Sequence, residues 1–133
     1  MMGNPEQMTI QRPGNVVRSP VDIATAPFWV EILLGGAADG ENTAVRASLD
    51  PGTITHWHTH PRGQLLYALS GKGLAQREGR AVEELRAGDA VWFAAGEKHW
   101  HGATPDSPFS YISIQATEAG RIVDWLEPVE VLS

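Results

Sequence analysis

The sequence predicts an all-β protein, a small antiparallel β-barrel of the jelly-roll type. From residue 27 onward, short β-like runs are separated by turn signals at intervals of about 8 to 12 residues, which is typical of a sandwich or barrel. Helical periodicity is weak throughout the chain. Only residues 120–126 would suit a short helix, and an extended tail is the alternative there.

We expect eight strands, separated by turn signals. Their ranges are 28–34, 43–49, 53–60, 64–69, 74–78, 81–85, 90–94 and 109–115. A turn signal at 50–52 separates the second strand from the third, and one at 70–73 separates the fourth from the fifth. Glu78-Gly79 is expected to form a two-residue hairpin turn between the fifth and the sixth.

The 133 residues suit one domain of ordinary size. Residues 1–26 are polar and are interrupted by Pro5, Pro13 and Pro20, so we expect an N-terminal arm, with one edge strand at most. Residues 27–133 are expected to form the single barrel domain.

Composition and charge exclude several classes of protein. The 10 Lys and Arg residues are outnumbered by 16 Asp and Glu, and a net charge of -6 repels phosphate backbones, so we expect no nucleic-acid partner. No apolar run reaches the roughly 18 to 20 residues that a membrane span needs. The absence of cysteine excludes disulfides, thiolate zinc sites and a cysteine nucleophile. The first residues lack the apolar stretch of a signal peptide, so we expect a cytoplasmic protein.

All five histidines fall within two short windows, 56–60 and 99–101. In the first window His56, His58 and His60 are spaced by two residues on an expected strand. Because side chains alternate across a strand, all three are expected to share one face.

The turn at 61–63 is long enough to bring Gln64 beside His60 on the next strand. His99 and His101 share one face of a third segment. Imidazole binds Mn, Fe, Co, Ni, Cu and Zn, and three imidazoles with an amide oxygen leave open positions on such a metal. The pattern therefore predicts one divalent metal and a small-molecule substrate.

Two stretches resemble the two sequence motifs of the cupin superfamily. The first motif contains, at matching intervals, Gly52, His58-Thr59-His60, Gln64 and Gly71. The second contains Gly88, Ala94-Ala95-Gly96 and His99, with Ala94 in place of a proline. The resemblance implies that 27–133 is a single cupin domain with a mononuclear metal inside its barrel. Small cupins of this kind are usually dimers, so we expect a homodimer.

The resemblance narrows to the small bacterial cupins of the manganese-dependent hydroxynitrile lyase group, the (R)-mandelonitrile lyase-like group. It rests on residues 58–64, 73–85, 88–102 and 123–125. It implies the metal ligands His58, His60, Gln64 and His99. Mn(II) is then the expected metal, with Fe, Ni, Co or Zn as alternatives. The resemblance places His101 in the cavity beside the metal, and a further cavity histidine of the group falls at Tyr111.

Catalytic roles are expected for three cavity residues. An imidazole such as His101 has a pKa suited to a general base at neutral pH. His56 is a weaker candidate, as a catalytic residue or as a partner of a ligand. On the expected strand 109–115, either the face that carries Tyr111, Ser113 and Gln115 or the opposite face lines the cavity. The resemblance favours an inward Tyr111, whose hydroxyl would donate a hydrogen bond to the substrate.

The neutral amide of Gln64 decides the expected chemistry. It leaves the charge of a divalent metal undiminished, which favours polarisation of a substrate oxygen over redox chemistry. We expect a metal-dependent lyase acting on a small hydroxyl or carbonyl compound, with cyanohydrin cleavage as the concrete case. The alternatives are an Fe(II) dioxygenase and a non-catalytic sensor or small-ligand-binding module.

Overall fold

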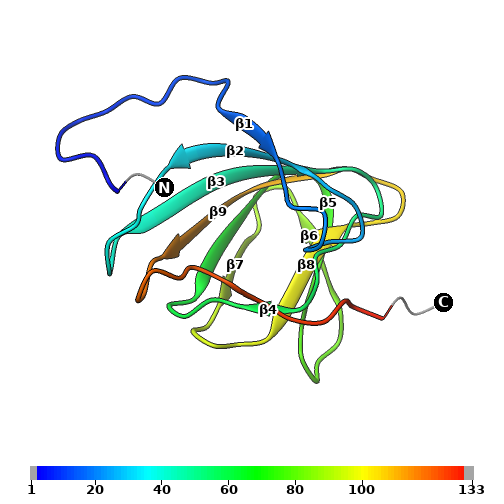
Figure 1. Cartoon of the computed structure of the whole chain (residues 1–133). Coiled ribbons are helices and arrows are strands. Elements are labelled where there is room, and N and C mark those ends of the chain that lie inside the picture. Colours follow the sequence, from blue (N-terminus) through cyan, green and yellow to red (C-terminus); the bar gives the residue numbers. More distant parts are fainter. Residues whose placement is uncertain (1–2, 131–133) are drawn as a thin grey trace.

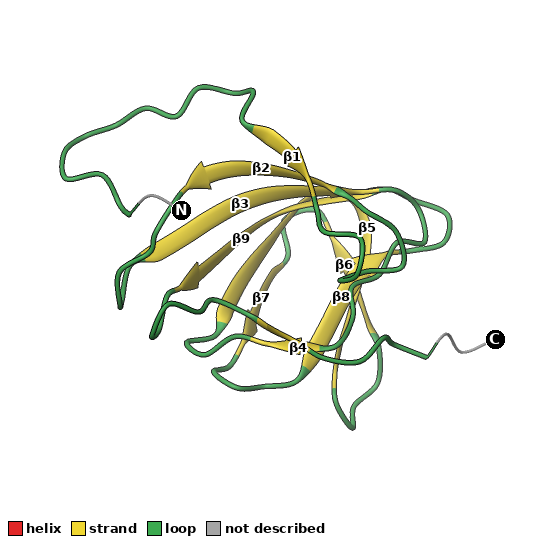
Figure 2. Ribbon diagram, viewed as in Figure 1, coloured by secondary structure: helices red, strands yellow, loops and turns green. Residues whose placement is uncertain are grey.

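The computed structural model describes residues 3–130, which form ten strands and no helix, so the all-β prediction is confirmed (Figures 1 and 2). The strands are β1 (Val16–Arg18), β2 (Trp29–Leu34), β3 (Asn42–Leu49), β4 (His58–Thr59), β5 (Gln64–Arg77), β6 (Glu83–Arg86), β7 (Ala90–Phe93), β8 (His99–Ala103), β9 (Phe109–Ala116) and β10 (Asp124–Trp125). Among the described residues, no helical segment has the length and apolarity that crossing a membrane requires.

All strand pairs are antiparallel, and the sheet curls into a half-barrel. Along the sheet the order is β1-β2-β3-β9-β5-β8-β4-β10, and β6 and β7 both pair with β5. In Figure 1, β1, β2, β3 and β9 form one curved wall, and β8 and β4 lie opposite it. The two walls enclose the apolar core.

Strand β5 is the element that curls the sheet. Its first half pairs with β9 and its second half pairs with β8, so one strand belongs to both walls. The expected break at 70–73 is therefore wrong. Gly71 adopts a positive φ of 78°, and a side chain there would collide with the carbonyl oxygen of Pro108. The glycine bends the strand without ending it.

Three other expectations have different outcomes. The expected strand at 53–60 is mostly irregular, since only β4 remains of it and Ile54 makes an isolated bridge to Gly102. A turn is present at Glu78-Gly79, with the amide of Arg80 donating to the carbonyl of Arg77 at 3.1 Å, but the expected two-residue hairpin is not formed. The pairing of β5 with β6 begins only at Ala75 and Glu83, so residues 76–82 connect the two paired segments. Residues 120–126 contain no helix: Gly120 lies in a turn, Arg121 makes an isolated bridge to Glu118, and Asp124–Trp125 form β10.

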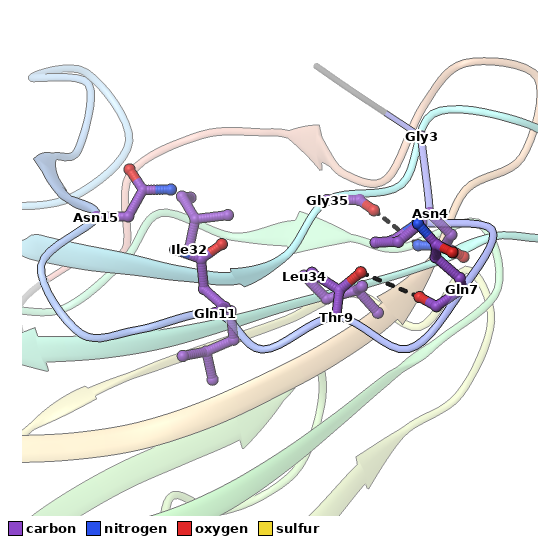
Figure 3. A pocket seen from close by; sticks show the side chains of 11 residues that line it. Gly3, Asn4, Gln7, Thr9, Gln11, Asn15, Ile32, Leu34 and Gly35 are labelled. Atoms are coloured by element: carbon purple, nitrogen blue, oxygen red, sulfur yellow. Dashed lines mark hydrogen bonds between the residues drawn. The ribbon is translucent and has the colours of Figure 1, made fainter.

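The N-terminal segment joins the sheet only in part. β1 pairs with β2, and Ile23 and Ala24 are buried in the core. Residues 5–12 are exposed and arch away from β2, which leaves a groove of about 740 Å³ beside Ile32 and Leu34 (Figure 3).

Candidate metal centre

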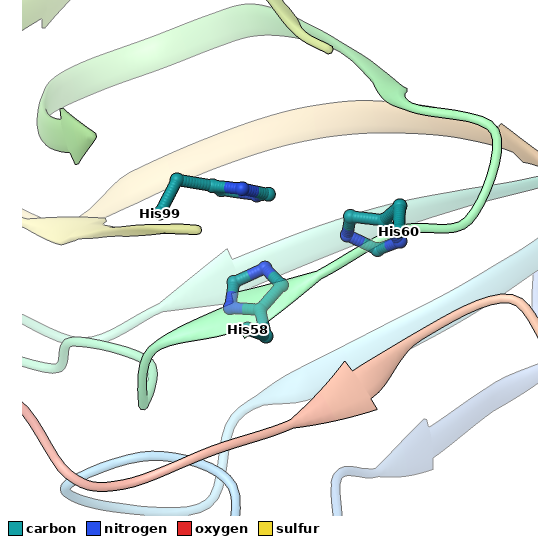
Figure 4. Close-up of side chains that lie close together, drawn as sticks. All are labelled: His58, His60 and His99. Atoms are coloured by element: carbon teal, nitrogen blue, oxygen red, sulfur yellow. The ribbon is translucent and has the colours of Figure 1, made fainter. Parts of the chain in front are cut away.

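Three buried histidines converge between the two walls of the half-barrel. His58 on β4 and His99 on β8 are direct cross-strand partners, and His60 follows just beyond the end of β4. One ring nitrogen from each lies within 4.8 Å of the others (Figure 4). The alternation along 58–60 and the pairing of β4 with β8 are what bring the three rings together.

Each of these rings is oriented by a main-chain carbonyl. The Nδ1 atoms of His58, His60 and His99 lie 2.8, 2.6 and 2.8 Å from the carbonyl oxygens of His56, Ile122 and Glu97, respectively. A carbonyl oxygen can only accept a hydrogen bond, so Nδ1 carries the proton in each ring. The lone pair of each ring is then on Nε2, as a metal ligand requires.

Burial keeps these histidines neutral at pH 7. It lowers the pKa of His99 to about 4, and it lowers the pKa of His60. The pKa of His58 lies well below its usual range, first because of burial and second because of the neighbouring imidazoles. A neutral ring is the form that binds a metal without first losing a proton.

Gln64, at the start of β5, supplies a fourth donor. Its Oε1 lies 3.3 Å from Nε2 of His99, and its Nε2 donates to Oε1 of Gln115. Because His99 carries its proton on Nδ1, a lone pair on its Nε2 faces a lone pair on Oε1 of Gln64 across that 3.3 Å. In addition, Nε2 of His60 is buried without a hydrogen-bond partner in the described part of the chain. A cation bound between these atoms would satisfy all of them, so the donor set fits a divalent first-row metal.

A cavity of about 160 Å³ adjoins this cluster. Its apolar wall comes from β2, from β3, from the segment before β2 and from the C-terminal segment, and it contains Ile23, Phe28, Val30, Val45, Ala47, Ile122, Val123 and Trp125. His58, His60 and Gln64 form part of the polar side. The cavity thus combines an apolar chamber with a few convergent polar groups, as small-molecule sites do.

His101 lies on the polar side of the cavity and is buried. Its ring centroid lies 6.0 Å from that of His99, and both of its ring nitrogens are buried without a partner among residues 3–130. Burial, followed by the nearby His99 and His60, holds its pKa well below the usual range. His101 is therefore a neutral imidazole with one free donor and one free acceptor.

The inward face of β9 is the one that carries Tyr111, Ser113 and Gln115, and all three line the cavity. The ring of Tyr111 lies edge-on to His101, with centroids 5.0 Å apart. Burial raises the pKa of Tyr111, so its hydroxyl stays protonated. Ile112 and Ile114 point outward.

The expected inward orientation of His56 does not occur. Thr53 and Thr55 are buried, and the alternation changes phase before His58, so Thr55 lines the cavity where His56 was expected. His56 is half-buried and contributes through its main-chain carbonyl, which holds the ring of His58. The irregular backbone between the isolated bridge at Thr55 and β4 is the cause.

Several supporting residues escaped the sequence reasoning. The ring of Phe93 stacks on His99, with centroids 3.7 Å apart, and Trp125 packs against His58 at 4.6 Å. Thr43 accepts a hydrogen bond from Gln115. Thr43 is the first residue of the expected strand 43–49, so the alternation along that strand could have predicted its inward orientation. The pairing of Thr43 with Gln115 on another strand could not have been predicted in this way.

A family model described as "Cupin domain" matches residues 45–115. A protein named (R)-mandelonitrile lyase, from Granulicella tundricola, is 42% identical over 124 residues, which cover 92% of this chain and 95% of that protein. This chain is therefore a homologue of a lyase, as the resemblance of the motifs predicts.

Solved structures show the same architecture. A cupin-like protein from Thermotoga maritima superposes with a TM-score of 0.75 and 33% identity, over 85% of this chain and 86% of that one. A polyketide cyclase from Streptomyces resistomycificus gives a TM-score of 0.70 at 20% identity, over 93% and 88% of the two chains, and shares the fold alone.

Proposed function

The chain belongs to the cupin family, and from this premise we propose that it is a metal-dependent lyase that cleaves a cyanohydrin to an aldehyde and cyanide. The homologue at 42% identity carries the name of such a lyase and is matched over nearly its whole length. The cluster of His58, His60 and His99, with Gln64 beside it, offers four neutral donors for the metal. We propose Mn(II) as that metal.

The observation that carries the proposal is the state of His101. Burying an imidazole with no hydrogen-bond partner for either nitrogen destabilises the fold, unless a ligand forms hydrogen bonds with these nitrogens. His101 stands beside the metal centre and faces an apolar cavity. This is where a proton acceptor is needed if a substrate hydroxyl is to lose its proton next to a metal.

The residues of the cavity have different roles in the proposed reaction. A divalent ion held by the four donors would polarise the substrate oxygen. Neutral His101 accepts the hydroxyl proton, the carbonyl double bond forms, and the bond to the nitrile carbon breaks with its electron pair leaving on cyanide. The imidazolium then returns the proton to cyanide. Tyr111 stays protonated and donates a hydrogen bond, and the apolar wall holds the organic group and excludes water.

The proposal predicts that the Mn(II)-loaded protein releases benzaldehyde from mandelonitrile. The assay follows aldehyde absorbance and cyanide, with metal-free protein as the control. A parallel assay with Fe(II)-loaded protein and candidate diols or diketones in an oxygen electrode tests the dioxygenase alternative. Oxygen uptake at catalytic rates without cyanohydrin cleavage would overturn the lyase assignment. Inactivity in both assays would favour the binding module.

We further propose that the protein is a homodimer that pairs through the outer face of the sheet. Leu65 on β5 lies in register between Trp92 on β7 and Ile114 on β9, and the three side chains are 39%, 61% and 38% exposed. The row continues through Ala44 to Leu34. An exposed apolar row of this length favours contact with another protein surface.

Light scattering coupled to size-exclusion chromatography checks the dimer. We expect the wild-type chain to have twice the chain mass, and Leu65→Glu/Trp92→Glu to have the mass of one chain, because charges on this row repel across the interface. Lys72→Glu, an exposed change away from the row, serves as the control. A wild-type chain of monomer mass would contradict the proposal.

A further inference from the structure

A buried hydrogen-bond chain crosses the inner face of the sheet and ends at the Gln64 amide. Thr43 on β3, Gln115 on β9 and Gln64 on β5 occupy one cross-strand row. The hydroxyl of Thr43 donates to the main-chain oxygen of Gln115 at 3.2 Å. Nε2 of Gln115 donates to Oγ1 of Thr43 at 2.7 Å, and Nε2 of Gln64 donates to Oε1 of Gln115 at 3.3 Å.

The direction of this chain is set at its far end. A main-chain carbonyl can only accept, so the hydroxyl of Thr43 gives its single proton to Gln115 O and can then only accept from the Gln115 side chain. The Gln115 amide is thereby turned with nitrogen toward Thr43 and oxygen toward Gln64. Gln64 presents its own nitrogen in return, and its oxygen is left facing His99.

The opposite orientation of the Gln64 amide would weaken metal binding. With the Gln64 amide reversed, its nitrogen would face the lone pair on Nε2 of His99 and donate a hydrogen bond to it. That contact would remove the amide oxygen as a donor and occupy one imidazole nitrogen as well. Two of the four donors would then be lost to one rotation of an amide.

We propose that Thr43 and Gln115 are positioning residues that hold the Gln64 amide with its oxygen toward the metal centre. The inference rests on the metal site of the proposed function and adds residues that do not belong to the donor set. Phe93 closes the same row and stacks on His99, so the row supports both Gln64 and its histidine neighbour. Partners of this kind typically contribute about 10- to 100-fold to metal affinity.

The test measures Mn(II) affinity by chelator competition on the full chain, together with the absorption spectrum of the Co(II)-loaded protein. Thr43→Val and Gln115→Leu are expected to weaken Mn(II) binding about 10- to 100-fold and to change the Co(II) spectrum, because one oxygen donor is lost. Thr43→Ser keeps the hydroxyl that sets the direction of the row. This conservative variant is expected to retain wild-type affinity and spectrum.

Thr117→Val is the matched control. Thr117 is buried, and its hydroxyl donates to the carbonyl of Gly36 outside the row. It is expected to leave the affinity and the Co(II) spectrum unchanged. Wild-type affinity and an unchanged spectrum in both Thr43→Val and Gln115→Leu would overturn the inference. A wild-type chain that binds no metal would instead overturn the proposed function, and the positioning role with it.

Discussion

The double variant His60→Ala/His99→Ala is expected to lose its bound metal completely. The change removes two of the three clustered imidazoles and leaves His58 with the Gln64 amide. Two neutral donors do not hold a first-row divalent ion against water, since structural and catalytic sites use at least three protein ligands. Elemental analysis of the wild-type chain is expected to give about one metal per chain.

A matched histidine change controls for this result. His56→Ala removes an imidazole two residues from His58 but leaves the main-chain carbonyl that orients the ring of His58. It is expected to keep the metal content of the wild type. Equal metal in the double variant and in the wild type would show that the ion, if any, binds elsewhere. Circular dichroism is used to check that both variants keep the β-sheet fold.

The variant His101→Ala is expected to keep its metal and to lose about 10²-fold or more in turnover of mandelonitrile, the usual size of a general acid–base contribution. This loss corresponds to about 2.7 kcal/mol in the activation barrier. His101 is outside the donor cluster, so the metal should stay, and its two unpartnered ring nitrogens are the free acid–base groups of the cavity.

Added imidazole provides a second measurement. If His101 acts as the base, imidazole entering the space left by the alanine should restore part of the lost turnover. His101→Asn keeps a hydrogen-bonding side chain without a base and should remain as slow as the alanine variant. Unchanged kcat in His101→Ala, with the metal in place, would reduce His101 to a structural role.

The contrast between His56 and His58 shows where strand periodicity stops being informative. Alternation correctly relates His58 to His60, because they are separated by one residue of nearly regular strand. It fails between His56 and His58, because the backbone leaves the strand conformation there and the phase changes. Periodicity is a local property, and a single irregular residue resets it.

The amino-acid pattern was enough to predict the β class and the spacing of the clustered histidines and, together with the family resemblance, the inward face of β9. These features depend on neighbouring residues along one strand. The unbroken course of β5 through Gly71 into both walls could be seen only in the folded chain, because the bend depends on the close approach to Pro108. The same is true of the carbonyl groups that orient the histidine rings and of the hydrogen-bonded row from Thr43 to Gln64. Thr43 and Gln115 are 72 residues apart in the chain, and only the strand register, which is set by the packing of the whole sheet, places them in contact.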